Sequence, residues 1–103
     1  MHTPDEFLRQ DKIRGIVRIR NLKTDEVYLL ESEDAVRSYK DERFKLDLSI
    51  HSCRKLQEAY SGLGLELFII EIDTEADKDQ DLDILLEERK EHYRANGIKL
   101  YND

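Results

Sequence analysis

The stretch Gly15–Leu30, which reads GIVRIRNLKTDEVYLL, decides the fold. In its first half apolar residues alternate with arginines, which predicts a half-buried β-strand over residues 13–20. Residues 21–26 are polar and turn-like, and residues 27–30 are apolar enough to form a second strand. Because so few residues separate the two strands, we expect them to pair as an antiparallel hairpin.

Three arginines share one face of the predicted first strand: Arg14, Arg18 and Arg20. Two interpretations of this face stay open. The arginines could contact phosphate groups, together with lysines and arginines on the helices that follow, or they could pair with acidic side chains on neighbouring elements.

The remainder of the chain alternates between helix and strand signals, with no internal repeat or linker that would divide it. We therefore expect one α/β domain over residues 1–103, with a small mixed three-stranded sheet, an N-terminal β-hairpin and flanking helices. Thr3, Pro4 and Glu6 form a capping pattern, so residues 1–14 are expected to be an N-terminal extension with a short helix. The other predicted elements are helices from Ser32 to about Leu46 and from Ser52 to Gly62 or Gly64, a strand at residues 68–72, a loop at residues 73–80, a helix from Leu82 to Asn96 and Gly97, and a short strand or extended segment at residues 98–101.

Charge and composition narrow the range of functions. Charged residues make up 40% of the chain, hydrophobic residues 39%, and the formal net charge is −7. The segment Glu71–Glu91 holds ten acidic and three basic residues and so supplies the negative excess. This charge argues against nonspecific binding to nucleic acid, although a basic face within residues 1–70 stays open. No apolar run approaches the roughly 20 residues of a membrane span, and the start of the chain does not resemble a signal peptide, so we expect a cytoplasmic protein without a membrane partner.

The hairpin is followed, in order, by a series of short motifs. The full series is Gly15-Ile16-Val17, Tyr28-Leu29-Leu30, Ser32-Glu33-Asp34, Arg43-Phe44-x-Leu46, His51, Leu56-Gln57 with Gly64, Phe68-x-x-Glu71 and Tyr101-Asn102. In this order the motifs resemble those of the GIY-YIG nuclease superfamily, in particular its phage-type members, over about residues 15–102. The resemblance implies the fold of that family, with the GIY and YIG strands as its opening hairpin.

The resemblance also implies a reaction. In this family a glutamate on the last long helix holds one divalent metal, Mg²⁺ or Mn²⁺, a tyrosine assists the attacking water, and an arginine stabilises the phosphorane. These groups supply what hydrolysis of a phosphodiester in DNA needs, namely a route for the proton of water and positive charge for a pentavalent anion. The catalytic candidates are Tyr28, Arg37, His51 and Asn102, and the metal candidates are Glu87 and Glu88.

The sequence departs from the family at several catalytic positions. Val17 stands in place of the first tyrosine and has no hydroxyl. By spacing from Tyr28, the family's arginine falls at Ser38 and its histidine, one turn later, at Glu42. Arg37 is adjacent to Ser38, but one residue along a helix is a rotation of about 100°.

The metal position is ambiguous because the last helix is rich in acids. Counted back from Tyr93, the position of the metal-binding glutamate falls on Lys90. Other registers place it at Glu87, Glu88 or Glu91.

We therefore expect a GIY-YIG-like nuclease-superfamily domain with impaired or lost metal-dependent phosphodiester hydrolysis. Removal of one donor to a transition-state oxyanion costs about 3–4 kcal/mol, so the loss of several groups leaves little activity. Two alternatives stay open: an active divalent-metal-dependent DNA endonuclease, and a non-catalytic module that binds nucleic acid or a protein partner.

Overall fold

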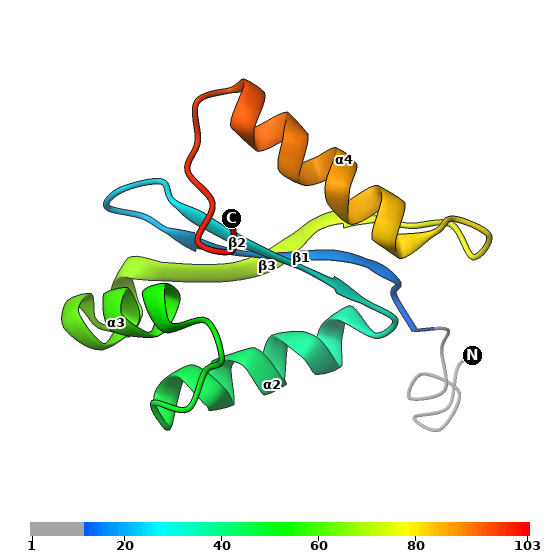
Figure 1. Cartoon of the computed structure of the whole chain (residues 1–103). Helices are drawn as coiled ribbons and strands as arrows, with labels where there is room; N and C mark the ends of the chain where they lie inside the picture. The colour runs from blue at the N-terminus through cyan, green and yellow to red at the C-terminus, as the bar shows by residue number, and fades with distance from the viewer. Residues whose placement is uncertain (1–11) are drawn as a thin grey trace, which may run out of the picture.

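The computed structural model describes residues 12–103, and the short helix predicted within residues 1–14 falls outside the described residues. The chain forms one sheet with helices on both of its faces (Figure 1). No helix in the described part is long and apolar enough to cross a membrane. The elements, in order, are β1 (Gly15–Asn21), β2 (Val27–Ser32), α2 (Ala35–Asp47), α3 (Arg54–Leu63), the short 3₁₀ helix η1 (Leu65–Leu67), β3 (Phe68–Glu75) and α4 (Leu82–Ala95).

The sheet has the strand order β2-β1-β3, and both pairs of neighbouring strands are antiparallel. The predicted hairpin is confirmed, with Ile19 of β1 opposite Tyr28 of β2. Parallel pairing is limited, among residues 12–103, to an isolated bridge between Val27 and Leu100, so the sheet is less mixed than predicted. The three strands, the N-terminal hairpin and the flanking helices agree with the predicted α/β architecture.

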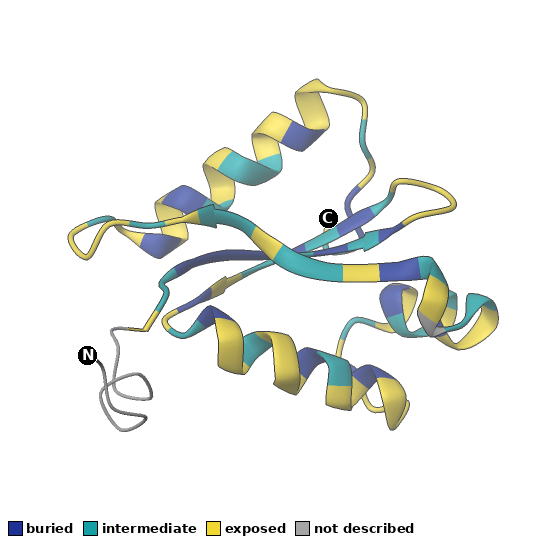
Figure 2. Ribbon diagram, turned by 180° about the vertical axis from the view of Figure 1, so that it is seen from behind, coloured by how far each residue is buried: buried dark blue, intermediate teal, exposed yellow. Residues whose placement is uncertain are grey.

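Strand β1 is buried on both faces, whereas the alternation with arginine predicted a half-buried strand. Ile16 and Ile19 are both 0% exposed and belong to different core clusters. The reason is the position of β1 in the centre of the sheet, where α4 covers one face and α2 and α3 cover the other (Figure 1). Exposed residues gather instead on the outer faces of the helices (Figure 2).

Two core clusters fill the space between the sheet and the helices. α2 contributes only Leu46 to its cluster, whereas α3 contributes Leu56 and Tyr60. The cluster on the α4 face consists of Ile16, Val27, Leu29, Leu82, Leu85, Tyr93 and Leu100, and the cluster on the α2 and α3 face consists of Ile19, Leu46, Leu56, Tyr60, Phe68 and Tyr101.

Helix α2 begins at Ala35, later than the predicted start at Ser32, which is the last residue of β2. The N-cap is Asp34, whose carboxylate accepts a hydrogen bond of 3.3 Å from the backbone N–H of Arg37. An aspartate satisfies one of the free N–H groups of the first turn as well as a serine does, so sequence alone could not choose between the two caps.

Strand β3 runs further than predicted, to Glu75, and α4 agrees with the prediction at both ends. The side chain of Asp81 caps α4 by accepting a hydrogen bond of 3.1 Å from the N–H of Ile84. Gly97 follows the helix with a φ of +75°, the left-handed conformation that glycine adopts without strain.

The C-terminal segment covers the outer edge of β2. Backbone hydrogen bonds connect Val27 with Lys99 and Tyr101. The side chain of Asn102 continues this pairing, because it donates to the carbonyl oxygen of Leu29 at 2.6 Å and accepts from the N–H of the same residue at 3.4 Å. The free backbone groups of an edge strand are satisfied here by the chain itself.

Candidate functional site

Two of the four catalytic candidates, Tyr28 and His51, lie side by side. Tyr28 projects from β2 and His51 from the loop between α2 and α3, and their rings meet edge to face with centroids 5.2 Å apart. Glu42 of α2 completes the group, with its Oε1 at 2.6 Å from Nε2 of His51. Gln57 fixes the loop, because its side chain accepts from the N–H of His51 and donates to the carbonyl oxygen of Leu46, both at 3.0 Å.

Both ring nitrogens of His51 are engaged inside the protein. Nδ1 accepts a hydrogen bond of 3.0 Å from the backbone N–H of Cys53, so Nδ1 carries no proton. Nε2 therefore carries the proton of the neutral ring and donates a hydrogen bond to Glu42. The imidazole side chain is 1% exposed, which leaves it no free lone pair with which to accept a proton from a substrate water.

Glu42 is a buried carboxylate, with 6% of its side chain exposed. Burial opposes its ionisation, but hydrogen bonds from His51 and Lys45 outweigh this effect and hold the pKa of Glu42 below its ordinary value. The ammonium group of Lys45 lies 3.3 Å from Oε2. Glu42 thus carries a negative charge at neutral pH, at the position where the resemblance places a histidine.

Tyr28 is held in its protonated form. Burial raises the pKa of its hydroxyl to about 12, and the negative charge of Glu42 adds to the effect. Within residues 12–103 the hydroxyl makes no hydrogen bond to a group that could remove its proton. At neutral pH Tyr28 can therefore donate a hydrogen bond but cannot act as a base.

Val17 and Ser38 stand at the two positions where the resemblance places a tyrosine and an arginine. The hydroxyl of Ser38 lies 2.5 Å from that of Ser32, so the two serines satisfy each other. Val17 lines an apolar cavity of about 210 Å³ instead of presenting a hydroxyl. The other residues that line this cavity are Ala35, Val36, Tyr39, Glu71 and Ile72.

The remaining candidates belong to other elements, and Asn102 among them contacts Leu29, next to Tyr28 in β2. Asn102 is engaged with the backbone of Leu29 at the edge of the sheet. Arg37 is on the outer face of α2, with 79% of its side chain exposed and its Nε 3.9 Å from Asp41. Glu87 and Glu88 are exposed on α4, which covers the opposite face of the sheet.

These residues do not fit the single divalent metal that the resemblance implies. The side chain of Glu87 is 67% exposed, and its nearest charged neighbour is the ammonium group of Lys90 at 3.9 Å. The α4 side chain that reaches the sheet beside these acids is a cation, Arg89, which pairs with Asp73 at 2.7 Å. In the described part of the chain no three His, Cys, Asp or Glu residues are grouped as a metal site would require.

A buried charge network between the sheet and α4 was missed by sequence reasoning. Asp73, with 2% of its side chain exposed, accepts hydrogen bonds from Arg89 and from the hydroxyl of Tyr93. Arg18 of β1 donates to the same hydroxyl at 2.7 Å and pairs with Glu71. The only sequence signal for this network was that Arg89 and Tyr93 share the apolar stripe of α4. Asp73 was predicted to lie in a loop.

Almost every arginine of the described residues is paired with an acid. The exception is Arg54, which has no carboxylate within 4.0 Å among residues 12–103. For the arginine face of β1, pairing with neighbouring acids is therefore the interpretation that the structure supports. The pairs are Arg14–Glu33, Arg18–Glu71, Arg20–Asp25, Arg37–Asp41, Arg43–Asp47, Arg89–Asp73, and Arg94 with Glu91 and Asp103.

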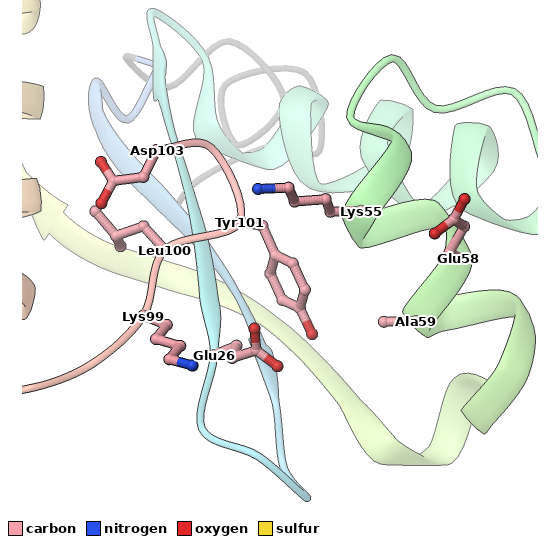
Figure 3. A pocket seen from close by; sticks show the side chains of 8 residues that line it. All are labelled: Glu26, Lys55, Glu58, Ala59, Lys99, Leu100, Tyr101 and Asp103. Carbon is pink, nitrogen blue, oxygen red and sulfur yellow. The ribbon is translucent and has the colours of Figure 1, made fainter.

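A hollow of about 730 Å³ was not indicated by any motif. It lies between α3, the C-terminal segment and the start of β2, and the side chains of Tyr101, Lys55 and Lys99 line it from different sides (Figure 3). Three acids surround the two lysines, so the hollow offers no net positive charge to a phosphate. The other residues that line it are Glu26, Glu58, Ala59, Leu100 and Asp103.

Comparisons with known proteins identify the fold. No protein-family model matches the sequence, and no curated protein does. Among solved structures, the catalytic domain of the homing endonuclease I-TevI matches with a TM-score of 0.66 and 24% identity, over 80% of this chain and 86% of that domain. A mutant of the same domain matches with a TM-score of 0.64 and 24% identity, over 81% of this chain and 82% of that one. The chain therefore has the predicted GIY-YIG-like α/β fold.

Proposed function

We propose, starting from the GIY-YIG-like fold, that this chain is a nuclease-superfamily domain in which phosphodiester hydrolysis is impaired or lost. The observation that carries the proposal is the state of His51, the best-placed acid–base group. Its Nδ1 accepts from Cys53, its Nε2 donates to Glu42, and its side chain is 1% exposed. A ring in this state cannot exchange a proton with a substrate unless one of two buried hydrogen bonds breaks.

The groups around His51 support the same conclusion. Tyr28 would have to lose a proton at a pKa of about 12 to act as a base. The carboxylate of Glu42 would repel a phosphodiester, and Val17 offers no hydroxyl. Each lost donor to a transition-state oxyanion costs about 3–4 kcal/mol, although such losses are not additive.

We infer a non-catalytic binding module, and between nucleic acid and protein as partners the charge distribution favours protein. Binding to a phosphate backbone uses arginines and lysines that are free to replace counterions. Among residues 12–103 the arginines other than Arg54 already contact acids, and the net charge of the chain is −7.

The loss of hydrolysis is tested with supercoiled plasmid DNA in the presence of Mg²⁺ or Mn²⁺. We expect the wild-type chain to nick the plasmid no faster than a Tyr28→Phe variant, because Tyr28, with a pKa of about 12, stays protonated at neutral pH and cannot act as a base. Gel electrophoresis measures the fraction of relaxed circles over time. Robust metal-dependent nicking by the wild type that disappears in Tyr28→Phe would overturn the proposal.

The preference for protein over nucleic acid is tested by fluorescence anisotropy with a short labelled DNA duplex. We expect no saturable binding even at low salt, because the net charge of −7 repels the phosphate backbone. The matched variant is Arg54→Ala, which removes the one arginine that has no acid beside it in the described residues. An affinity that falls steeply with added salt and weakens in Arg54→Ala would contradict the expectation.

A further inference from the structure

The two edge strands of the sheet, β2 and β3, differ in whether the backbone groups on their outer sides are paired. The outer edge of β2 is covered by Lys99, Tyr101 and Asn102. β3 forms the other edge, and no segment of residues 12–103 pairs with its outer side. Figure 2 shows β3 running across the front of the molecule, with α4 above it and α2 below. Alternate N–H and C=O groups of β3 are therefore available for another strand.

An apolar groove lies directly beside this open edge. The cavity of about 210 Å³ sits between α2 and the sheet, with Val17 opposite Ile72 at its base. Val36 and Tyr39 of α2 form its wall and are 51% and 39% exposed, and Ile72 is 37% exposed. Apolar side chains that stay exposed around a cavity lose contact with water when a ligand covers them, which favours binding.

The groove exists because only a few residues of α2 pack against the sheet. Ala35, Glu42 and Leu46 are its buried residues, and they form a narrow stripe. Val36 and Tyr39 lie on the flank of this stripe that faces β3, so they border the cavity without filling it. A strand with a helix running along its open edge is the arrangement by which several peptide-binding domains take up a ligand as an added strand.

We propose that β3 and this groove bind an extended segment of a partner protein as a fourth strand of the sheet. One apolar side chain of the segment enters the cavity between Val36, Tyr39 and Ile72, and basic side chains flank it. The inference goes beyond the loss of hydrolysis and does not depend on it, since backbone pairing at β3 uses neither Tyr28 nor His51.

The acidic residues around β3 indicate that the bound segment is basic. Glu71 and Asp73 are paired with arginines of this chain, whereas Glu75, Asp77 and Asp79 have no salt bridge within the described residues. A basic segment would neutralise these three acids. Pairing of β3 with the β3 of a second copy would supply no basic side chain for these acids, because β3 contains no lysine or arginine.

The size of the groove also favours a peptide over a folded surface. A volume of about 210 Å³ accommodates a single large apolar side chain and little more. Binding of a strand would then draw its affinity from main-chain hydrogen bonds and its specificity from that one side chain.

The test uses a synthetic peptide as long as β3 in which lysine and valine alternate. Binding is followed by amide chemical shifts and hydrogen exchange of the ¹⁵N-labelled full chain. We expect saturable binding, shifts centred on residues 69–74, and slower exchange of the β3 amides that point outward. Tyr39→Ala should weaken binding by about tenfold through loss of the groove wall, and Phe44→Ala, which removes an exposed side chain that does not line the cavity, should not.

Two further peptides separate strand addition from simple charge attraction. A peptide of the same composition with alternate backbone nitrogens methylated cannot pair with β3, and it should not bind. A peptide of alternating glutamate and valine should bind at least tenfold more weakly than the lysine peptide. Equal binding of the methylated peptide, or no saturable binding of the lysine peptide, overturns the proposal.

The free chain provides the remaining control. Outward amides of β3 that already exchange as slowly as those of β1 would mean that the edge is occupied without a partner. Protection that grows with protein concentration would identify a second copy as the occupant, and protection independent of concentration would identify residues of this same chain. Either result overturns the assignment of the edge to a partner peptide, and neither bears on the plasmid assay.

Discussion

Replacement of Gly15 by alanine will destabilise the fold by about 3 kcal/mol or more, because no room exists for a methyl group at this position. A Cβ on Gly15 would overlap the carbonyl oxygen of Thr74 and would lie 3.0 Å from Cα of Glu75. Both are backbone atoms of β3, so a side-chain rotation cannot relieve the overlap. The end of β3 would have to move away from β1, and the pairing that closes the sheet would weaken.

The measurement is urea denaturation followed by circular dichroism, with Gly62→Ala as the control. Gly62 lies in α3, and a Cβ there meets nothing within 4 Å. Alanine is the better helix former by about 1 kcal/mol, so Gly62→Ala should leave the midpoint unchanged or raise it. A Gly15→Ala midpoint that equals that of Gly62→Ala would show that β3 adapts freely and that the close approach of the two strands is not required.

This steric requirement explains why the hairpin was predictable from sequence. The motif residues Gly15-Ile16-Val17 encode the close approach of two backbones and the start of a buried strand, which are properties of the fold. They remain readable although Val17 stands where the resemblance expects a tyrosine. The same reasoning accounts for the correct placement of α4, whose ends are set by Asp81 and Gly97 through local geometry alone.

The environment of the arginines could not be predicted in the same way. Alternation in β1 assigns Arg18 and Arg20 to one face, but it does not say whether water or a helix lies over that face. Only tertiary packing brings Glu71 and Tyr93 against Arg18, from segments far along the chain. Sequence periodicity shows which side chains share a face of a strand, but it does not show what covers each face.

The candidate site, like the fold, could be predicted from the sequence only in part. The resemblance gave Tyr28 and His51 as two of the catalytic candidates, and in the structure their rings lie edge to face. The direction of Arg37 depends on the rotation of a helix, where an error of one residue turns a side chain by about 100°. The roles of Tyr28, Arg37, His51 and Asn102, and of Glu87 and Glu88, stay predictions that the plasmid assay addresses.

Replacement of Asp73 by alanine will cost about 3–5 kcal/mol of stability, the second large effect that we expect. Its carboxylate is buried and accepts hydrogen bonds from Arg89, Tyr93 and Thr74. Without it, Arg89 keeps its charge between α4 and the sheet with no counter-charge. The matched control is Asp41→Ala, which breaks an exposed pair with Arg37 and should change stability by no more than about 0.5 kcal/mol.

The dependence on pH separates this explanation from a simple packing defect. Burial opposes ionisation of Asp73, but the hydrogen bonds from Arg89, Tyr93 and Thr74 hold its pKa below the ordinary value. A carboxyl group whose pKa is lower in the folded chain stabilises that chain above the unfolded pKa of about 3.9, and this contribution disappears as the pH falls through the folded pKa. The difference between wild type and Asp73→Ala should therefore narrow in acid, whereas a packing defect would leave it constant.

A double variant makes the argument quantitative. Asp73→Leu combined with Arg89→Met removes both charges and fills the space with apolar atoms, so it should recover most of the stability that Asp73→Ala loses. Recovery would show that the fold does not require this ion pair for its stability. It would also show that the α4 face, where the resemblance expects a metal-binding glutamate, is held by a structural ion pair that the fold can replace with a hydrophobic contact.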